Sequence, residues 1–257
     1  MADGELTASG SLKGRVSEEE WDVRVSLAAL YRLVALHGWD DMIYTHISAR
    51  LPGADHKFLI NPYGLFFEEI TASSLVRIDL DGNVLQPTPH AINPAGFTIH
   101  SAVHQKRDDA RFVMHLHTDA GVGVAGQSFG LLPLSQHALI VLPHLAYHDY
   151  EGIALDLGER ERLVKDLGDK RLMLLRNHGT LAVGGSAADC WLAMYYLEKA
   201  CAQQIKALCA GADNVLLAPC QAQATVTQQV STRGFAGALS WPGNLRRLDR
   251  ALPGYDA

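Results

Sequence analysis

Long apolar runs are missing from this chain of 257 residues. No segment approaches the roughly 20 consecutive apolar residues that a membrane-spanning helix needs. The first stretch, MADGELTASGSLKGRVSEEE, is polar and acidic, and it lacks the apolar core of a secretory signal. The sequence therefore predicts a cytoplasmic protein with no membrane partner.

An excess of positive charge is also missing. Lys and Arg number 22 against 28 Asp and Glu, which gives a formal net charge of −6, and neither sign forms a long run. Because nucleic acids and anionic membranes are bound by basic surfaces, we expect no nucleic-acid partner.

Cysteine is scarce, and its spacing carries no metal or redox motif. No two of the four cysteines form a C-x-x-C pair: Cys190, Cys201, Cys209 and Cys220. This spacing excludes zinc ribbons and dithiol redox sites, and it favours reduced thiols. The twelve histidines, in contrast, are many for this length.

Helix and strand patterns mix without strict alternation. Apolar spacings of three and four predict helices over 21–38, 96–107, 157–168, 186–211 and 240–255. Alternating or continuous apolar runs predict strands over 42–51, 56–64, 110–117, 137–143 and 171–179, and DGN at 81–83 predicts a hairpin. Ser17 and Ser186 are typical helix caps. We expect an α/β fold in which helices cover a mixed or antiparallel sheet.

The stretch HLHTDAGVGVAG permits two interpretations. Gly121, Gly123 and Gly126 match the G-x-G-x-x-G turn that grips a dinucleotide. Such a unit needs an acidic residue about 20 positions on, and Asp149 and Glu151 lie beyond a proline-broken segment. We favour the alternative, in which these glycines let a helix pack closely on the sheet.

The same stretch predicts a metal site. His115 and His117 are two apart in a strand, so they project from one face. Two imidazoles in an apolar strand need polar partners, and His178 ends another apolar strand at a turn made with Asn177 and Gly179. Three neutral imidazoles leave open positions on a divalent ion, which is typical of a catalytic site.

Several motifs, which extend from about Trp21 to Gly211, resemble those of the class II aldolase/adducin family in order and spacing. They are THISARLP, HKFLINPYGLFFEEITASSLVRIDLDGNV, GFTIHSAVH, VMHLHTDAG, LLPLS, AYHDYEGI and LLRNHGTLAVG. The resemblance implies a three-layer α/β/α sandwich around a largely antiparallel sheet. It also implies a homotetramer with active sites at the subunit interfaces.

The resemblance further implies one divalent metal ion per subunit, held by His115, His117 and His178. Zinc is the expected ion, although manganese, cobalt and iron also accept imidazole. We divide the chain into a flexible tail (1–17), a class II aldolase/adducin-like domain (18–215) and a C-terminal arm (216–257) that packs on a neighbouring subunit.

This sequence departs from the sugar-phosphate aldolases and epimerases of the family. Those members carry Asn at His46, Thr-Gly at Tyr63-Gly64, and Ser-Ser-Glu at the positions that end in Gly96. Because the phosphate-binding groups and the acidic proton carrier are absent, we expect a small non-phosphorylated substrate. Tyr63, Gly64 and Gly96 stay substrate-binding candidates by position.

Four residues are catalytic candidates, and one of them is the candidate proton donor. His137 lies near the position of the family's tyrosine acid, and its imidazole suits proton transfer near neutral pH, although it could instead satisfy a buried backbone group. His46 could meet a substrate carboxylate or only form a hydrogen bond with the neighbouring loop. Tyr147 and His148 lie in a loop that the resemblance brings towards the metal.

Arg247 is the last substrate-binding candidate. With its basic neighbours it could reach across a subunit boundary and pair with an acidic substrate, since a guanidinium binds a carboxylate bidentately. A solvated basic face is the simpler alternative.

We therefore predict a metal-dependent lyase that cleaves a carbon–carbon bond of a small oxo or hydroxy acid, by retro-aldol cleavage or decarboxylation, through a metal-stabilised enolate. Two alternatives stay open. One is an adducin-like interaction module without turnover, and the other is an Fe(II)-dependent oxygenase on the same scaffold.

Overall fold

The computed structural model describes residues 10–53, 56–152, 158–230 and 235–257, and within them the side-chain surroundings of 94–98 and 159 are not described. The first nine residues of the expected tail lie outside this range. Among the described residues, no helix is both long and apolar enough to cross a membrane.

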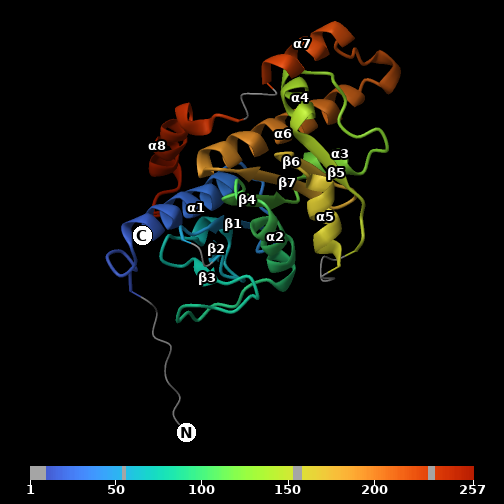
Figure 1. Cartoon of the computed structure of the whole chain (residues 1–257). Helices are drawn as coiled ribbons and strands as arrows, with labels where there is room; N and C mark the ends of the chain where they lie inside the picture. Colours follow the sequence, from blue (N-terminus) through green and yellow to red (C-terminus); the bar gives the residue numbers. More distant parts are fainter. Residues whose placement is uncertain (1–9, 54–55, 153–157, 231–234) are drawn as a thin grey trace.

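A seven-stranded sheet forms the centre of the molecule (Figure 1), in the order β3-β2-β1-β4-β7-β6-β5. Its strands are β1 (His46–Arg50), β2 (Phe58–Ile60), β3 (Val76–Ile78), β4 (Phe112–Leu116), β5 (Leu145–His148), β6 (Leu172–Leu175) and β7 (Gly179–Gly184). Only β5 and β6 pair in parallel, and the other pairs are antiparallel. The predicted α/β fold with a mixed, largely antiparallel sheet is confirmed.

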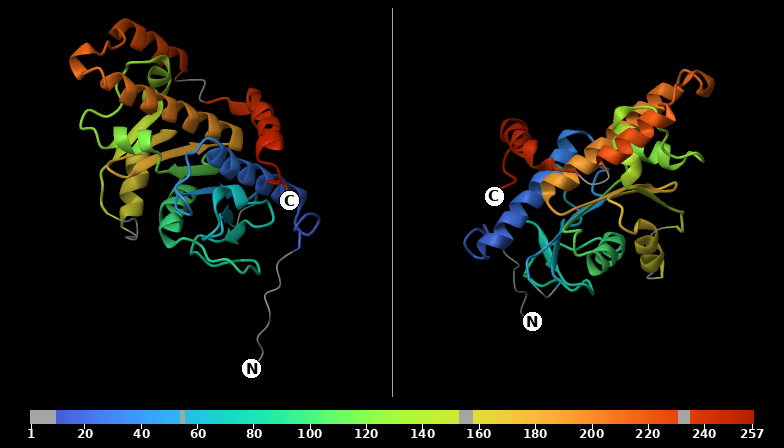
Figure 2. Two further views of the ribbon diagram at one scale, coloured as in Figure 1. Left: turned by 180° about the vertical axis from the view of Figure 1, so that it is seen from behind. Right: turned by 45° about the horizontal axis from the view of Figure 1, so that its top comes forward.

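Helices cover both faces of the sheet, as the views in Figures 1 and 2 agree. One face carries α1 (Glu18–Leu36), α3 (Asp119–Ala125), α4 (Gln136–Val141) and α6 (Ala187–Leu208), and the other carries α2 (Pro94–Lys106) and α5 (Glu159–Leu167). The 3-10 turns are η1 (Phe67–Glu69), η2 (Leu142–His144), η3 (Ala212–Asn214) and η4 (Gly237–Leu239).

The alternation of β4 explains these layers. Phe112, Met114 and Leu116 join the core under α1 and α6. Val113 joins the core under α2 and α5, and His115 has the same parity. The strand therefore buries apolar side chains on one face and brings a histidine to the other.

Two predicted helix starts are confirmed. The Ser17 hydroxyl accepts a hydrogen bond from the Glu20 amide and begins α1. The Ser186 hydroxyl accepts one from the Asp189 amide and begins α6.

The glycines of GVGVAG serve close packing, as we favoured. A Cβ atom added at Gly121 would lie 2.5 Å from Thr180 Cγ2 and 2.9 Å from Glu198 Oε1. One added at Gly123 would lie 3.2 Å from Ile205 Cδ1. Gly121 and Gly123 belong to α3. A larger side chain at either position would prevent α3 from packing so closely on β7 and α6.

The strand predicted over 137–143 is wrong. This segment is α4 followed by η2, and the next strand, β5, begins at Leu145. Ser135 caps α4 by accepting from the Ala138 amide at 3.2 Å. A short apolar run does not distinguish a buried strand from a buried helix, and the cap decides for the helix. The predicted hairpin is reduced to one bridge, between Ile78 and Val84.

The C-terminal arm contains α7 (Cys220–Val230) and α8 (Trp241–Ala251). Its helix α8 packs on α1 of its own chain, and the expected contact with a neighbouring subunit stays a prediction. The chain end is held there as well, because the Ala72 amide donates to the Tyr255 carbonyl at 2.9 Å and Arg32 donates to the Pro253 carbonyl.

Candidate metal centre

The three predicted ligands come together where β4 ends and β7 begins. His115 lies in β4 and His117 directly follows that strand. His178 lies in the turn between β6 and β7, after Asn177, whose φ of 54° makes the turn tight. The ring centroids of His115 and His117 are 4.7 Å apart, and that of His178 lies 4.7 and 4.9 Å from them.

One nitrogen atom from each ring falls in a single cluster, within 4.8 Å of the other two. His115 is buried and the other two rings are half-buried. The site is therefore open on one side, which suits a cation that also receives a ligand from outside the protein.

Hydrogen bonds decide which nitrogens face the centre of the cluster. His115 Nδ1 lies 3.0 Å from the Thr180 carbonyl oxygen, and His117 Nδ1 lies 3.0 Å from Asp41 Oδ2. Both partners only accept, so each Nδ1 carries the proton and each Nε2 keeps its lone pair. The two Nε2 atoms are 3.0 Å apart.

This arrangement fits a cation. Two lone pairs at that separation repel each other, whereas two imidazole ligands on one tetrahedral zinc ion lie about 3.3 Å apart. Partners on the outer nitrogen that fix the ring are typical of histidine metal sites. His115, His117 and His178 would hold the ion.

Gly179 makes room for the rings. A Cβ atom there would lie 2.4 Å from the Leu116 carbonyl oxygen, 3.0 Å from His117 Cδ2 and 3.2 Å from His115 Cε1. The residue after His178 must therefore be a glycine for the two strands and the rings to meet.

The environment keeps the rings of His115 and His178 neutral. Burial, followed by the neighbouring imidazoles, holds the pKa of His115 well below its usual value. Burial and His117 lower the pKa of His178 to about 4. Neutral imidazole is the form that binds a metal ion, so the site is ready for one at neutral pH.

His46 lies beside this cluster. It pairs with His115 across β1 and β4, and the two ring centroids are 5.1 Å apart. Its Nδ1 lies 2.8 Å from His100 Nε2 in α2, so its hydrogen-bond partner is a helix residue rather than one in the neighbouring loop. Behind it, Ser48, His100 and His104 form a buried polar cluster.

No pattern in the sequence predicts a role for His100 or His104. Their spacing of four residues puts them on one helix face, and His46 and Ser48 share one strand face. Each pattern is visible alone, but nothing in it predicts that these two faces meet.

Two other proton-donor candidates are held by local contacts. The Tyr147 hydroxyl accepts from the Leu131 amide at 3.0 Å, and Arg176 stacks on its ring at 4.4 Å. His137, in α4, lies 3.2 Å from the Gln203 amide nitrogen, so its partner is a side chain rather than the backbone. Within the described residues, no contact joins either candidate to the three-histidine cluster.

His148 lies nearer to the cluster. It is buried at the end of β5 and contributes to the lowered pKa of His178. Its Nδ1 donates to Asp166 Oδ2 at 2.7 Å.

The substrate-binding candidates come from three separate segments of the chain. Tyr63 is 36% exposed, and Gly64 has a φ of 105° that suits its turn. Gly96 falls in the first turn of α2, where the surroundings lie outside the described part of the chain. Arg247, in α8, lies 3.1 Å from His37 Nε2.

A cavity of about 350 Å³ adjoins the cluster. His117 lines it from one side and Glu198 from another, together with His37, Gly38, Trp39, Asp40, Thr118, Asp119, Ala120, Lys199 and Ala202. Glu198 is buried, and it accepts from the Thr118 hydroxyl at 2.6 Å. Burial raises its pKa to about 7.

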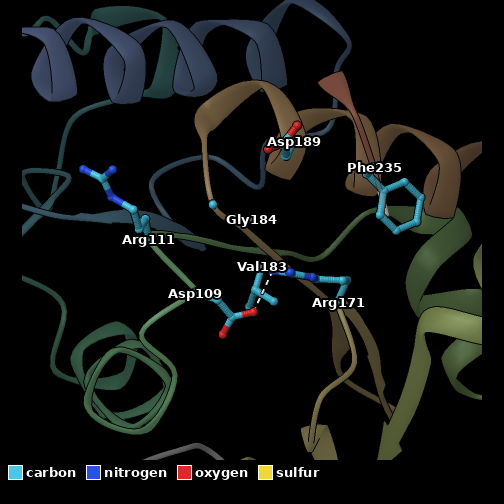
Figure 3. Close-up of a pocket in the computed structure, with 8 residues that line it drawn as sticks. Asp109, Arg111, Arg171, Val183, Gly184, Asp189 and Phe235 are labelled. Atoms are coloured by element: carbon cyan, nitrogen blue, oxygen red, sulfur yellow. Dashed lines mark ion pairs between the residues drawn. The ribbon is translucent and has the colours of Figure 1, made fainter. Parts of the chain in front are cut away.

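A second cavity lies at the opposite end of β4 and β7, between Asp109, Arg171 and Phe235 (Figure 3). Arg171 pairs with Asp109 at 2.9 Å, and Asp189 accepts from the Gly237 amide. Figure 3 shows Arg111 pointing away from that ion pair. Because its facing charges are already matched, this cavity is the weaker candidate for a substrate site.

Comparison with known proteins agrees with the geometry. The family model described as Class II Aldolase and Adducin N-terminal domain matches residues 25–205. A Caulobacter vibrioides protein provisionally named an aldolase class 2 protein is 68% identical over 256 residues, which are 99% of this chain and 99% of that protein.

Two further relatives differ in what their names describe. Alpha-adducin of Rattus norvegicus is 41% identical over 226 residues, which are 84% of this chain and 31% of that longer protein. The solved L-fuculose 1-phosphate aldolase from Glaciozyma antarctica PI12 is 25% identical, with a TM-score of 0.79 over 95% of this chain and 94% of that chain.

Proposed function

The chain belongs to the class II aldolase and adducin family, and from this premise we propose that it is a metal-dependent lyase. It cleaves a carbon–carbon bond, by retro-aldol cleavage or decarboxylation, in a small non-phosphorylated oxo or hydroxy acid. The cation is a divalent ion, with zinc expected and manganese, cobalt or iron as the other ions that imidazole accepts.

One observation carries the proposal. The Nε2 atoms of His115 and His117 face each other at 3.0 Å, and their Nδ1 atoms are bonded to the Thr180 carbonyl and the Asp41 carboxylate. A divalent cation held there supplies stabilisation of the negative charge that develops on a substrate oxygen when a bond to the adjacent carbon breaks.

The protein's own residues set what can bind. Asp41 and Thr180 orient two of the rings, and His46 closes one side of the cluster. His46, Tyr63 and Gly96 stand where the phosphate-binding members carry other residues, which supports a substrate without phosphate. The cavity lined by Trp39 and Glu198 offers room beside His117 for a small acid.

We also propose that the protein is a homotetramer whose active sites lie at subunit interfaces. His137 and Arg247 do not contact the three histidines of their own subunit within the described residues. In the proposed tetramer, both residues contribute to the active site of a neighbouring subunit.

The test begins with metal analysis of the purified protein. We expect close to one divalent ion per chain, loss of activity with a chelator and recovery with zinc. Substrates are screened as matched pairs of small hydroxy and oxo acids with and without phosphate. Turnover of the phosphorylated member alone would contradict the proposal, and oxygen consumption with iron would favour an oxygenase.

The similarity to alpha-adducin favours a second candidate, an interaction module without turnover. In that case the protein would be purified without metal, and a chelator would not change its binding to any partner. The His115→Ala variant separates the two candidates, because it abolishes lyase activity but leaves a metal-free interaction surface intact.

A further inference from the structure

A continuous line of hydrogen bonds runs from His104 in α2 to His46, whose ring lies beside that of His115 in the three-histidine cluster. His104 Nδ1 lies 3.0 Å from the Ala110 carbonyl oxygen, and His104 Nε2 lies 2.7 Å from the Ser48 hydroxyl. The same hydroxyl lies 2.5 Å from His100 Nδ1, and His100 Nε2 lies 2.8 Å from His46 Nδ1. We call these four residues the imidazole relay.

The carbonyl at one end fixes every proton along the relay. A carbonyl only accepts, so His104 Nδ1 carries the proton and His104 Nε2 accepts the Ser48 hydroxyl hydrogen. Ser48 has no second hydrogen to give, so it must accept from His100 Nδ1. His100 Nε2 is then unprotonated and accepts from His46 Nδ1. The last ring, His46, is left with a bare Nε2.

This assignment requires neutral rings, and the surroundings provide them. His46, His100 and His104 are each at most 4% exposed, and within the described residues each of their hydrogen bonds is to a serine, a histidine or a carbonyl. A charged imidazole buried without a carboxylate would be costly.

The bare nitrogen belongs to the site but not to the metal ligands. Nε2 lies on the side of the His46 ring away from His100, and among the described residues it has no hydrogen-bond partner. The His46 ring neighbours that of His115, yet His46 is not part of the three-residue ligand cluster. It is therefore placed to contact what the cation binds rather than the cation.

We propose that the imidazole relay holds His46 as a fixed hydrogen-bond acceptor, so that this side of the site selects a substrate hydroxyl and disfavours a carboxylate. This inference rests on the proposed function, and within it the relay favours hydroxy acids over the corresponding acids without a hydroxyl. It also reverses our expectation that His46 meets a substrate carboxylate, because a lone pair repels an anion. Ser48 and His104 are positioning residues.

The tautomer can be measured without any substrate. Long-range proton–nitrogen NMR of the metal-free full chain should show Nδ1 protonated and Nε2 bare in His46. The Ser48→Ala variant removes the link, so the His46 signals should shift towards a mixture of tautomers, while Ser48→Thr keeps the hydroxyl and the wild-type signals. A protonated Nε2 in the wild type, or identical spectra for Ser48→Ala, would overturn the relay.

Selection is measured with zinc-loaded protein and two probes, lactate and propionate, which differ by one hydroxyl. Calorimetry should show that the lactate preference of the wild type falls about three- to tenfold in Ser48→Ala, as expected for one lost hydrogen bond, and persists in Ser48→Thr. His46→Phe, which keeps a planar ring but removes the acceptor, should lower the preference even if Ser48→Ala folds poorly. An unchanged preference in His46→Phe would overturn the selection.

The two proposals fail differently. If the wild type bound neither zinc nor either acid, the proposed function and the hydroxyl contact would both be wrong, whatever the tautomer of His46. If the protein bound zinc, and lactate and propionate then bound with the same affinity as each other, only the selection by His46 would be wrong.

Discussion

Asp41 and the ring of His117 show how one residue outside the metal ligands controls the site. The carboxylate can only accept, and so it keeps the proton on Nδ1. Asp41→Asn can turn an N–H group towards that nitrogen and favour the other tautomer. We expect zinc affinity to fall about 10- to 100-fold, measured by competition with a chelator. Asp40→Asn is the matched control, and an equal loss there would contradict the assignment.

Gly179 is required by contact distances. A methyl group there meets a backbone oxygen at 2.4 Å, which forces the strands or the rings apart. Gly179→Ala should lower the free energy of unfolding by about 1–3 kcal/mol and weaken zinc binding as well. Urea unfolding and zinc titration check this, with Gly126→Ala as control, where the nearest atom lies at 3.6 Å.

Glu198 should make stability depend on pH. Burial raises its pKa from 4.5 to about 7, so the folded state holds the proton more tightly than the unfolded state. Its contribution is complete below about pH 4.5 and is lost as the pH rises through 7. The loss is about 3 kcal/mol.

The Glu198→Gln variant tests this sign. It should match the wild type at pH 5 in urea unfolding and be the more stable protein at pH 8. A wild type that gains stability relative to the variant between these pH values would show that the carboxylate has a partner at high pH.

Local sequence patterns predict some residues of the site and not others. His115, His117 and His178 could be predicted because strand parity and a turn residue are local properties. The relay could not, because His100 and His104 meet Ser48 only through the register of α2 over β1. That register is set by packing across the sheet.

At the scale of elements, β4 was predictable and α4 was not. A five-residue apolar strand between polar ends is a strong pattern, and β4 runs from Phe112 to Leu116. The apolar run that follows Ser135 has no clear period, and its state is decided by a single cap and by packing on α6.

The C-terminal segment acts as a clasp on α1. Removal of residues 253–257 takes away the Pro253 carbonyl from buried Arg32 and the buried ring of Tyr255. We expect a loss of roughly 2–4 kcal/mol in the free energy of unfolding, measured with urea. Tyr255→Phe removes only the bond to Asp249 and should cost less. Equal stability of the truncated chain would show that the clasp carries no energy.

At the scale of the whole molecule, the layers of the fold could be predicted from the alternation of apolar residues, whereas the oligomeric state could not. The resemblance to a family implied a tetramer, but a subunit interface leaves little trace in the sequence because apolar residues also remain on free surfaces. The C-terminal arm contacts its own subunit through α8, and its expected contact with a neighbouring subunit stays a prediction.

Light scattering tests the assembly. We expect a mass about four times that of the 27.9 kDa chain. If sites lie at interfaces, activity per chain should fall on dilution as the tetramer dissociates. A monomer whose activity per chain is independent of concentration would contradict the proposed interface sites.

The pairing of β4 with β7 has a consequence for biogenesis. A nascent chain that has emerged only as far as His117, directly after β4, carries two of the three imidazoles, and the third arrives with the much later turn before β7. The three ligands come together only after these distant strands have paired. Zinc binding would therefore report that the tertiary fold is complete, and a cotranslational folding assay could use it to time that step.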